Sequence, residues 1–167
     1  NGDGNGTAAD GQLHVDEIDI MYGSIICPDV SMVKDINNGS GVGDPQHLTV
    51  VGNTLYFTAN DSSNGHELWK SDGTANGTMM VKDINNGSDG ILTCGFFSGD
   101  CYMSLAVVGN TLYFSADNGT NGGELWKSDG TTNGTMMVKD INSNHLTAVG
   151  NTLYFAATDG VNGNELW

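Results

Sequence analysis

The chain has 167 residues, 38% of them hydrophobic, and carries five Lys and no Arg against 20 Asp and Glu, for a net charge of −15. Such a composition lacks the clustered cations that neutralise phosphate, so we expect no nucleic-acid partner and no anionic membrane partner. No apolar run approaches the roughly 18 residues of a membrane span, so no membrane insertion is expected. The 25 Gly and two Pro favour many short strands joined by tight turns.

The first 30 residues contain no repeat and form an expected N-terminal segment, 1–30. They begin with oxygen-bearing residues separated by Gly, a pattern that can wrap Ca²⁺, the one candidate cofactor. The candidate ligands are Asp3, Asn5 and Asp10. A calcium loop would have a bidentate Glu where Gln12 stands, and a flexible acidic tail is the alternative interpretation.

The remaining residues, 31–167, form a predicted β-repeat domain. The run VGNTLYF occurs three times, beginning at Val51, Val108 and Val149, and each copy is followed by a Gly- and Asn-rich turn and then by Glu-Leu-Trp. Two copies continue as WKSDGT and NGTMMVKDIN. The copies are offset by 57 and 41 residues, and the extra length lies mainly around 91–104, as expected of a loop insertion. The repeat units are expected at about 31–84, 85–141 and 142–167.

Each full unit is predicted to contain four short antiparallel strands. In the first full copy these are expected at 48–51, 55–58, 67–71 and 79–84. Gly52-Asn53 and Asp72-Gly73 supply hairpin turns between them. A unit of about 40 residues with four such strands has the size of a propeller blade. We therefore expect an all-β, β-propeller-like array of about three four-stranded antiparallel blades, the last incomplete; a β-solenoid or stacked sandwich is the alternative.

One small sheet cannot bury its own apolar face, so neighbouring blades must supply the other half of the core. We expect this inter-blade core at Tyr56, Trp69, Tyr113, Trp126, Tyr154 and Trp167. Four strand lysines are expected to pair with neighbouring carboxylates: Lys70, Lys82, Lys127 and Lys139. Asp72 and Asp129 are expected to form turns. A recurring polar set could form a repeated cation or sugar site, but we favour turn chemistry. It comprises Asp61, Asn64 and Glu67, with the equivalents Asn118, Asn121 and Glu124 and the equivalents Asp159, Asn162 and Glu165.

The run GHELWKSDGTANGTMMVKDI resembles the ELWxxDGT repeat family. The motif is complete at Glu67–Thr74 and Glu124–Thr131 and truncated at Glu165–Trp167. The resemblance extends from residue 31 to the end, and residues 1–30 depart from it. It implies a secreted or cell-surface protein with propeller-like repeats, and it implies no particular mechanism.

Cys94 and Cys101 lie seven residues apart in the inserted loop and are predicted to form a disulfide, with free thiols as the alternative. Cys27 is left over, and an odd Cys in a secreted chain indicates an intermolecular thiol. Seven Asn-x-Ser/Thr sequons are predicted glycosylation sites: Asn5, Asn38, Asn60, Asn76, Asn86, Asn118 and Asn133. Of these we favour Asn76, Asn118 and Asn133, because they lie in polar turns.

Counting strands predicts how copies join. A fourth-strand sequence precedes the first full unit, whereas the last unit stops after its third strand. The spare strand is predicted to pair with another copy and comprises Ser31, Met32, Val33, Lys34, Asp35 and Ile36. Such head-to-tail pairing gives either a ring or an open filament.

No His-Glu-x-x-His, nucleophile elbow or phosphate loop occurs in the sequence, so we expect no enzyme activity. The predicted function is that of an extracellular structural protein, which forms a filament or surface layer by head-to-tail strand complementation. The alternative is a lectin-like propeller module that binds glycans. The expected partners are further copies of the chain and glycans.

Overall fold

The computed structural model describes residues 30–91, 104–120 and 122–167. The chain divides into two units, Asn1–Met32 and Val33–Trp167, and the fold below is that of the second unit. Several predicted site residues lie outside the described residues: Asp3, Asn5, Asp10, Cys27, Cys94 and Cys101. The calcium, disulfide and intermolecular-thiol hypotheses therefore stay predictions.

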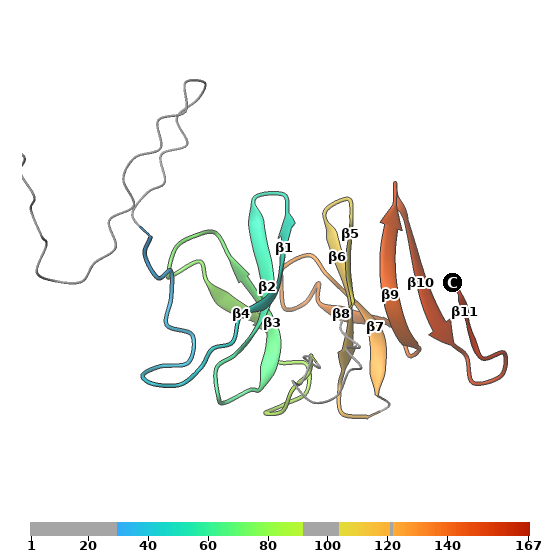
Figure 1. Cartoon of the computed structure of the whole chain (residues 1–167), viewed down its shortest axis with the longest axis horizontal. Coiled ribbons are helices and arrows are strands. Elements are labelled where there is room, and N and C mark those ends of the chain that lie inside the picture. Colours follow the sequence, from blue (N-terminus) through green and yellow to red (C-terminus); the bar gives the residue numbers. More distant parts are fainter. Residues whose placement is uncertain (1–29, 92–103, 121) are drawn as a thin grey trace, which may run out of the picture. The chain divides into compact units, whose positions relative to one another are not determined.

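The described residues form β-strands and no helix, so the all-β prediction is confirmed. They form three antiparallel sheets in which neighbours in the sheet are neighbours in the chain (Figure 1). Sheet 1 contains β1 (Gln46–Val51), β2 (Thr54–Asn60), β3 (His66–Ser71) and β4 (Met79–Lys82). Sheet 2 contains β5 (Leu105–Val108), β6 (Thr111–Asp117), β7 (Gly123–Ser128) and β8 (Met136–Lys139). Sheet 3 contains β9 (Asn142–Val149), β10 (Thr152–Thr158) and β11 (Asn164–Leu166).

Consecutive aromatic residues cover both faces of each sheet. In β2, Tyr56 and Phe57 are both buried although neighbours in a strand point to opposite faces. Tyr56 packs in a core cluster with Leu112, Phe114 and other residues of sheet 2. Phe57 packs on the opposite face. In sheets 1 and 2 the Tyr face therefore lies toward the following sheet and the Phe/Trp face toward the preceding part of the chain.

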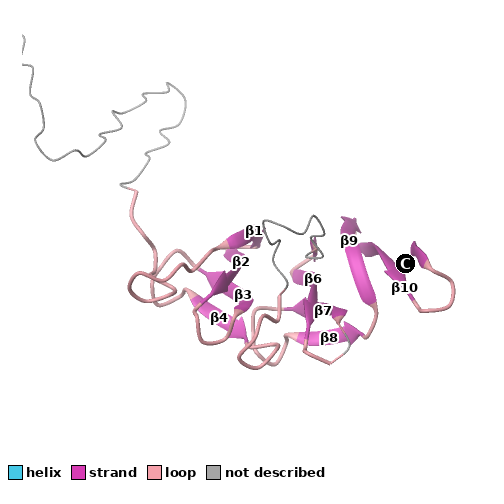
Figure 2. Cartoon of the chain, turned by 60° about the horizontal axis from the view of Figure 1, so that its bottom comes forward, coloured by secondary structure: helices cyan, strands magenta, loops and turns pink. Residues whose placement is uncertain are grey.

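The sheets follow one another side by side within the second unit (Figures 1 and 2). Trp126 joins the core between sheets 1 and 2, and Tyr113 packs on the core between sheets 2 and 3. Trp69 instead packs with Phe57, against Ile36 from the segment before β1. Tyr154 and Trp167 of sheet 3 are 40% and 39% exposed.

The Ser-Asp-Gly-Thr turns have the same geometry in sheets 1 and 2. Asp72 Oδ1 accepts hydrogen bonds from the backbone N–H of Thr74 at 2.9 Å and from its hydroxyl at 2.8 Å. The hydroxyls of Ser71 and Thr78 bond each other at 2.7 Å beneath the turn. Asp129 repeats these contacts in sheet 2, so both aspartates form turns as predicted.

Residues 31–36 form no strand, in contrast to the equivalent β4 and β8. A strand needs a neighbour to accept and donate its backbone hydrogen bonds, and no described strand pairs with this segment. The expected strand is thus absent from the single chain. Its pairing with another copy stays a prediction.

Within the part of the chain that the structure describes, no helix is long and apolar enough to cross a membrane.

Replacing Thr78 with Val should lower the free energy of unfolding by about 1–3 kcal/mol, because its buried hydroxyl bonds both Ser71 and the carbonyl of Thr74. Urea denaturation measures the change. Thr152→Val, at an exposed strand position, is the control and should be nearly neutral. Equal effects at both positions would contradict the importance of the turn.

Candidate functional site: the contacts between sheets

Lysine side chains reach from one sheet to backbone carbonyls of the next. Lys70 Nζ donates to the carbonyl of Gly130 at 2.7 Å, and Lys82 Nζ donates to that of Thr135 at 2.9 Å. Gly130 lies in the Ser-Asp-Gly-Thr turn of sheet 2, and Thr135 lies between that turn and β8. The prediction that these lysines pair with neighbouring carboxylates is therefore wrong for their hydrogen bonds. The reason is that carbonyl groups in and after this turn of sheet 2 point toward sheet 1, within hydrogen-bonding distance of the Lys70 and Lys82 ammonium groups.

The carboxylate of Asp129 interacts with Lys70 through its charge. Hydrogen bonds from Thr131 hold the pKa of Asp129 below its ordinary value, and the positive charge of Lys70 acts in the same direction. Asp129 is thus committed to its own turn. Lys70 reinforces that turn from the neighbouring sheet.

Two of the lysines also lie over tryptophan rings of the following sheet. Lys82 Nζ is 5.6 Å from the centre of the Trp126 ring, and Lys139 Nζ is 5.0 Å from that of Trp167. At such distances the ammonium group is attracted by the negative face of the ring. The same Lys–Trp pair thus recurs at both junctions between sheets.

A glycine in the turn lets the tyrosine of the preceding sheet approach. Gly130 has a φ of +86°, and a Cβ at this position would overlap the hydroxyl of Tyr56. Gly73 occupies the same turn position in sheet 1 with a φ of +90°, yet a Cβ there would meet no atom within 4 Å. The two glycines therefore share a backbone requirement, and only Gly130 has a packing requirement.

The segment before β1 repeats the contact between sheets without belonging to one. Lys34 Nζ donates to the carbonyl of Thr78 at 2.7 Å, and Thr78 is the repeat equivalent of Thr135. Ile36 packs against the Phe57–Trp69 face. The predicted donor residues Lys34 and Ile36 thus already contact sheet 1. They do so in the way that Lys82, at the end of β4, contacts sheet 2.

The Tyr face of sheet 3 has no such cover among the described residues. Tyr154, the equivalent of the buried Tyr56, is 40% exposed, and Val149 and Leu166 are more exposed still. A hollow of about 570 Å³ lies along β11. Its lining residues are Asp159, Asn162, Gly163, Glu165, Leu166 and Trp167.

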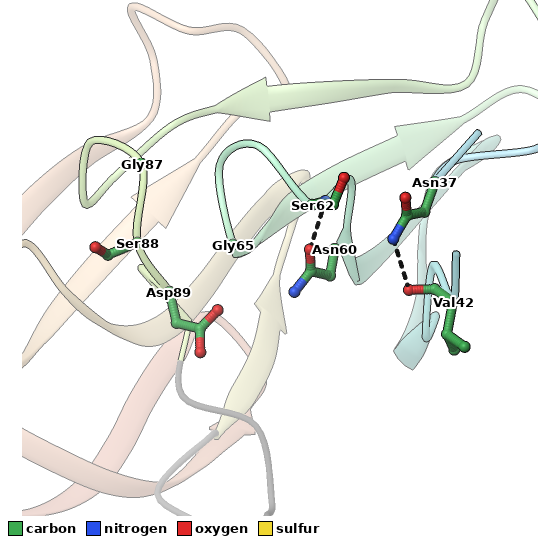
Figure 3. A pocket seen from close by; sticks show the side chains of 8 residues that line it. All are labelled: Asn37, Val42, Asn60, Ser62, Gly65, Gly87, Ser88 and Asp89. Carbon is green, nitrogen blue, oxygen red and sulfur yellow. Dashed lines mark hydrogen bonds between the residues drawn. The ribbon is translucent and has the colours of Figure 1, made fainter. Parts of the chain in front are cut away.

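A second, polar hollow of about 510 Å³ lies at one end of sheet 1, where three loops meet (Figure 3). Its lining residues are Asn37, Val42, Asn60, Ser62, Gly65, Gly87, Ser88 and Asp89. The carboxylate of Asp89 accepts the backbone N–H of His66 at 2.7 Å, and Asn60 Oδ1 accepts that of Ser62 at 2.6 Å. Much of the polarity of this hollow is therefore used by the protein itself. Among the described residues, no aromatic ring lines it.

Two glutamates of the recurring polar set, Glu67 and Glu124, are fully buried in sheets 1 and 2, which the sequence interpretation as turn residues did not predict. Glu67 Oε1 accepts the backbone N–H groups of Asn85 at 3.3 Å and Gly90 at 3.0 Å, while its Oε2 has no hydrogen-bond partner. Burial raises the pKa of Glu67 from 4.5 to about 8, although these bonds oppose the shift. Burial also raises the pKa of Glu124. The available signal was the position of Glu inside a strand, directly before Leu-Trp, in every copy.

The remaining repeated polar residues serve their own turns. Asp61 accepts the N–H groups of Ser63 and Asn64 at 2.9 and 2.8 Å, and Asp159 makes the equivalent bonds in sheet 3. This agrees with turn chemistry rather than a cation site. Within the described ranges, no cluster of three or more His, Cys, Asp or Glu side chains could hold a metal.

The sequons differ in how accessible the structure leaves them. Asn38, Asn76, Asn86 and Asn133 are exposed, and Asn60 and Asn118 are half-buried. The side chain of Asn118 accepts the backbone N–H of Thr120 at 2.9 Å. The exposed asparagines are therefore the better candidates for glycan attachment.

Gly130→Ala should destabilise the protein more than Gly73→Ala. Both variants place a Cβ at positive φ, at a cost of about 1–2 kcal/mol, and Gly130→Ala adds overpacking against Tyr56, about 1–3 kcal/mol. Chemical denaturation of both variants measures the difference. Tyr56→Phe removes the overlapping hydroxyl and should recover part of the Gly130→Ala loss. Equal losses, with no rescue, would contradict the contact.

The buried carboxyl of Glu67 should make stability depend on pH. The folded state holds this proton up to about pH 8, while the unfolded chain releases it near 4.5, so the free energy of unfolding should fall as pH rises between these values. Glu67→Gln cannot ionise and should flatten that slope, measured by urea unfolding at pH 5, 7 and 9. Glu165→Gln, at an exposed position, should leave it unchanged. An unaltered slope in Glu67→Gln would show that the group titrates normally.

No family model, curated protein or solved structure matches this chain. The resemblance of its motifs to the ELWxxDGT repeats therefore stays a prediction. The functional argument rests on the contacts between sheets.

Proposed function

We propose that this protein is an extracellular structural repeat protein, whose sheets are blades of a propeller-like array and whose copies join head to tail. One observation carries the proposal. Lys34 bonds the carbonyl of Thr78 as Lys82 bonds that of Thr135, although Lys34 belongs to no sheet of its own chain. The face of sheet 1 that would contact a preceding sheet is thus already covered by Lys34, which comes from a segment equivalent to the last strand of a sheet.

The two sides of the contact are chemically different, and this supports an assembly that grows in one direction. The donating side presents Tyr and Lys, and the receiving side presents Trp, Phe and turn carbonyls. A contact between unlike faces is heterologous and produces rings or open filaments. We favour the filament, in line with the strand-complementation hypothesis from the sequence.

Sequence features support an extracellular place for such an assembly. The motifs resemble those of secreted ELWxxDGT repeat proteins, and Asn76 and Asn133 are exposed sequons. A net charge of −15 repels unspecific partners of the same sign. A specific joint must then be short-ranged, as apolar packing and hydrogen bonds are.

The alternative function, a glycan-binding module, is favoured by the polar hollow lined by Asn60, Ser88 and Asp89. Amide and carboxylate groups can bond sugar hydroxyls, but none of the described residues that line this hollow supplies the aromatic platform expected of a lectin. A glycan array with the wild-type chain and with Asp89→Ala separates the two functions. A saturable signal lost in the variant would favour the lectin, and no signal would favour the structural protein.

The 167-residue chain should form species heavier than 17.5 kDa as its concentration rises, measured by analytical ultracentrifugation at 0.15 M salt, where charge repulsion is screened beyond about 8 Å. Tyr154→Glu places a charge on the open face of sheet 3 and should keep the chain monomeric. Leu48→Glu, which is also at an exposed position, is the control and should assemble normally. A wild-type chain that stays monomeric throughout would sink the proposal.

A further inference from the structure

We infer that Asn38 and Asn86 are sites of spontaneous modification, at which each asparagine closes a succinimide ring with the following glycine and is then hydrolysed to aspartate or isoaspartate. The carboxylates of Asp35 and Asp83 accept the proton that ring closure releases. This chemistry requires a single chain and does not depend on the proposed joining of copies. The hydrogen bonds around the Asn-Gly pairs distinguish these two sites from the others.

Ring closure needs an amide nitrogen that can lose its proton and a side chain that is free to reach it. The backbone nitrogen of the glycine attacks Cγ of the asparagine, and the proton of that nitrogen passes to a base. The bond from Cγ to Nδ2 breaks, and Nδ2 takes up a proton and leaves as ammonia. Water then opens the ring at either carbonyl, which gives aspartate or isoaspartate. A glycine favours the attack because it has no Cβ to obstruct it.

The pair Asn86-Gly87 lies open in the turn after β4, and Gly87 lines the polar hollow (Figure 3). Both residues are exposed, and the Asn86 side chain makes no hydrogen bond to any described residue. Gly87 donates its N–H to Asp83 Oδ2 at 3.4 Å. A carboxylate can act as a general base. The nitrogen that must react therefore already contacts a group that can take its proton.

The pair Asn38-Gly39 repeats this arrangement in the segment before β1. The sequence Val-Lys-Asp-Ile-Asn-Asn-Gly-Ser occurs at 33–40 and again at 81–88. Gly39 donates its N–H to Asp35 Oδ2 at 3.2 Å, and Asn38 and Gly39 are both exposed. The Asn38 side chain likewise has no hydrogen bond to a described residue. The contact between carboxylate and glycine therefore forms in both copies of this sequence.

The Asn-Gly pairs of the Ser-Asp-Gly-Thr turns are held differently. Gly77, which follows Asn76, donates its N–H to the hydroxyl of Thr74 at 2.9 Å. A hydroxyl is a poor base at neutral pH, and this one already donates its own proton to Asp72. A Cβ on Gly77 would overlap the Asp72 carboxylate, so the turn is also closely packed. The pair at Asn133 makes the equivalent contacts.

Three other asparagines that precede a glycine have side chains that are already hydrogen-bonded. Asn64 Nδ2 donates to Asp61 Oδ2 at 2.8 Å, and Asn162 Nδ2 donates to Asp159 Oδ2 at 2.9 Å. Asn118 shares the carboxylate contact at its glycine, but it is half-buried and its side-chain oxygen accepts a backbone N–H at 2.9 Å. These bonds must break before the side chain can reach the glycine nitrogen, and this slows the reaction.

Modification at Asn86 would reach the connection between sheets 1 and 2. Asn86 lies between Asn85 and Gly90, whose N–H groups bond the buried carboxyl of Glu67. Isoaspartate lengthens the backbone by a methylene group between these two anchors. Either product adds a negative charge to a turn that lines the same hollow as Asp89. A single reaction at this turn therefore alters both the hollow and the segment that leads to the next sheet.

Ageing the full chain, produced without glycosylation, in buffer and in urea tests the two sites. Peptide mapping by mass spectrometry, with enzymatic methylation to detect isoaspartate, measures the rate at each asparagine, and the rate in urea is the reference for each site. In the folded chain we expect Asn38 and Asn86 to react roughly tenfold faster than Asn76 and Asn133. In urea this difference should disappear. Equal rates in the folded chain, or no reaction at Asn38 and Asn86, would overturn the inference.

Asp83→Asn tests the carboxylate, with Asn38 and its own Asp35 as the control within the same molecule. We expect the folded variant to react roughly tenfold more slowly at Asn86 and at the wild-type rate at Asn38. In urea the variant and the wild type should agree. Loosening of the turn alone would speed the reaction, so a slower rate is not explained by structural damage. An unchanged or faster rate at Asn86, in a variant that circular dichroism shows to be folded, overturns the role of Asp83.

Discussion

The structure depends on lysine ammonium groups that find backbone carbonyls in the neighbouring sheet. The chain has only five cations among 20 acidic residues, and three of them, Lys34, Lys70 and Lys82, donate to carbonyls in or near the turn after β3 or β7. A partly buried ammonium group must be hydrogen-bonded to be tolerated. The carbonyls must therefore be held in place, and the hydrogen-bonded Asp-Gly-Thr turns hold them.

The contact between sheets consequently depends on the structure of the turn. Asp72 and Asp129 bond their own turns, and a Cβ on Gly77 or Gly134 would overlap the respective carboxylate. The hydrogen-bonded turns hold the carbonyls in place, and the carbonyls in turn determine where the ammonium groups of the preceding sheet's lysines bind. The apolar core between sheets, non-directional by itself, thereby acquires a defined register. The recurrence of the same contact at Lys34 and Lys82, at 2.7 and 2.9 Å, follows from the recurrence of the turn.

The sequence predicts the parts of this arrangement that depend on local chemistry. Strand positions and the Asp-Gly turns follow from alternation and turn residues, and they are found within about two residues of the predicted ranges. The partners of Lys70 and Lys82 could not be predicted, because a strand pattern shows which residues share a face but not which atoms of another sheet lie opposite. The burial of Glu67 was not predicted because its residue type indicates exposure, whereas the chain that folds over it after β4 buries it. Residues 31–36 were expected as a strand from repeat equivalence, but a strand depends on a partner that the pattern cannot supply.

The buried glutamates show why the connection between sheets matters as much as their faces. Glu67 binds the N–H of Gly90, and the carbonyl of Gly90 accepts the N–H of Asp117 in sheet 2 at 2.8 Å. A Cβ on Gly90 would overlap the Glu67 carboxylate, so this glycine permits the close approach. The carboxyl is thus one end of a chain of bonds that runs from β3 through the connecting segment into β6. Its burial is unfavourable for the ionised form, and this explains the pKa of about 8. Its equivalent Glu124 instead accepts the backbone N–H of Asn118 at 3.3 Å and the indole N–H of Trp126 at 3.2 Å, both within sheet 2 or its turn. Anchoring the connecting segment, and so positioning the next sheet, is therefore specific to Glu67.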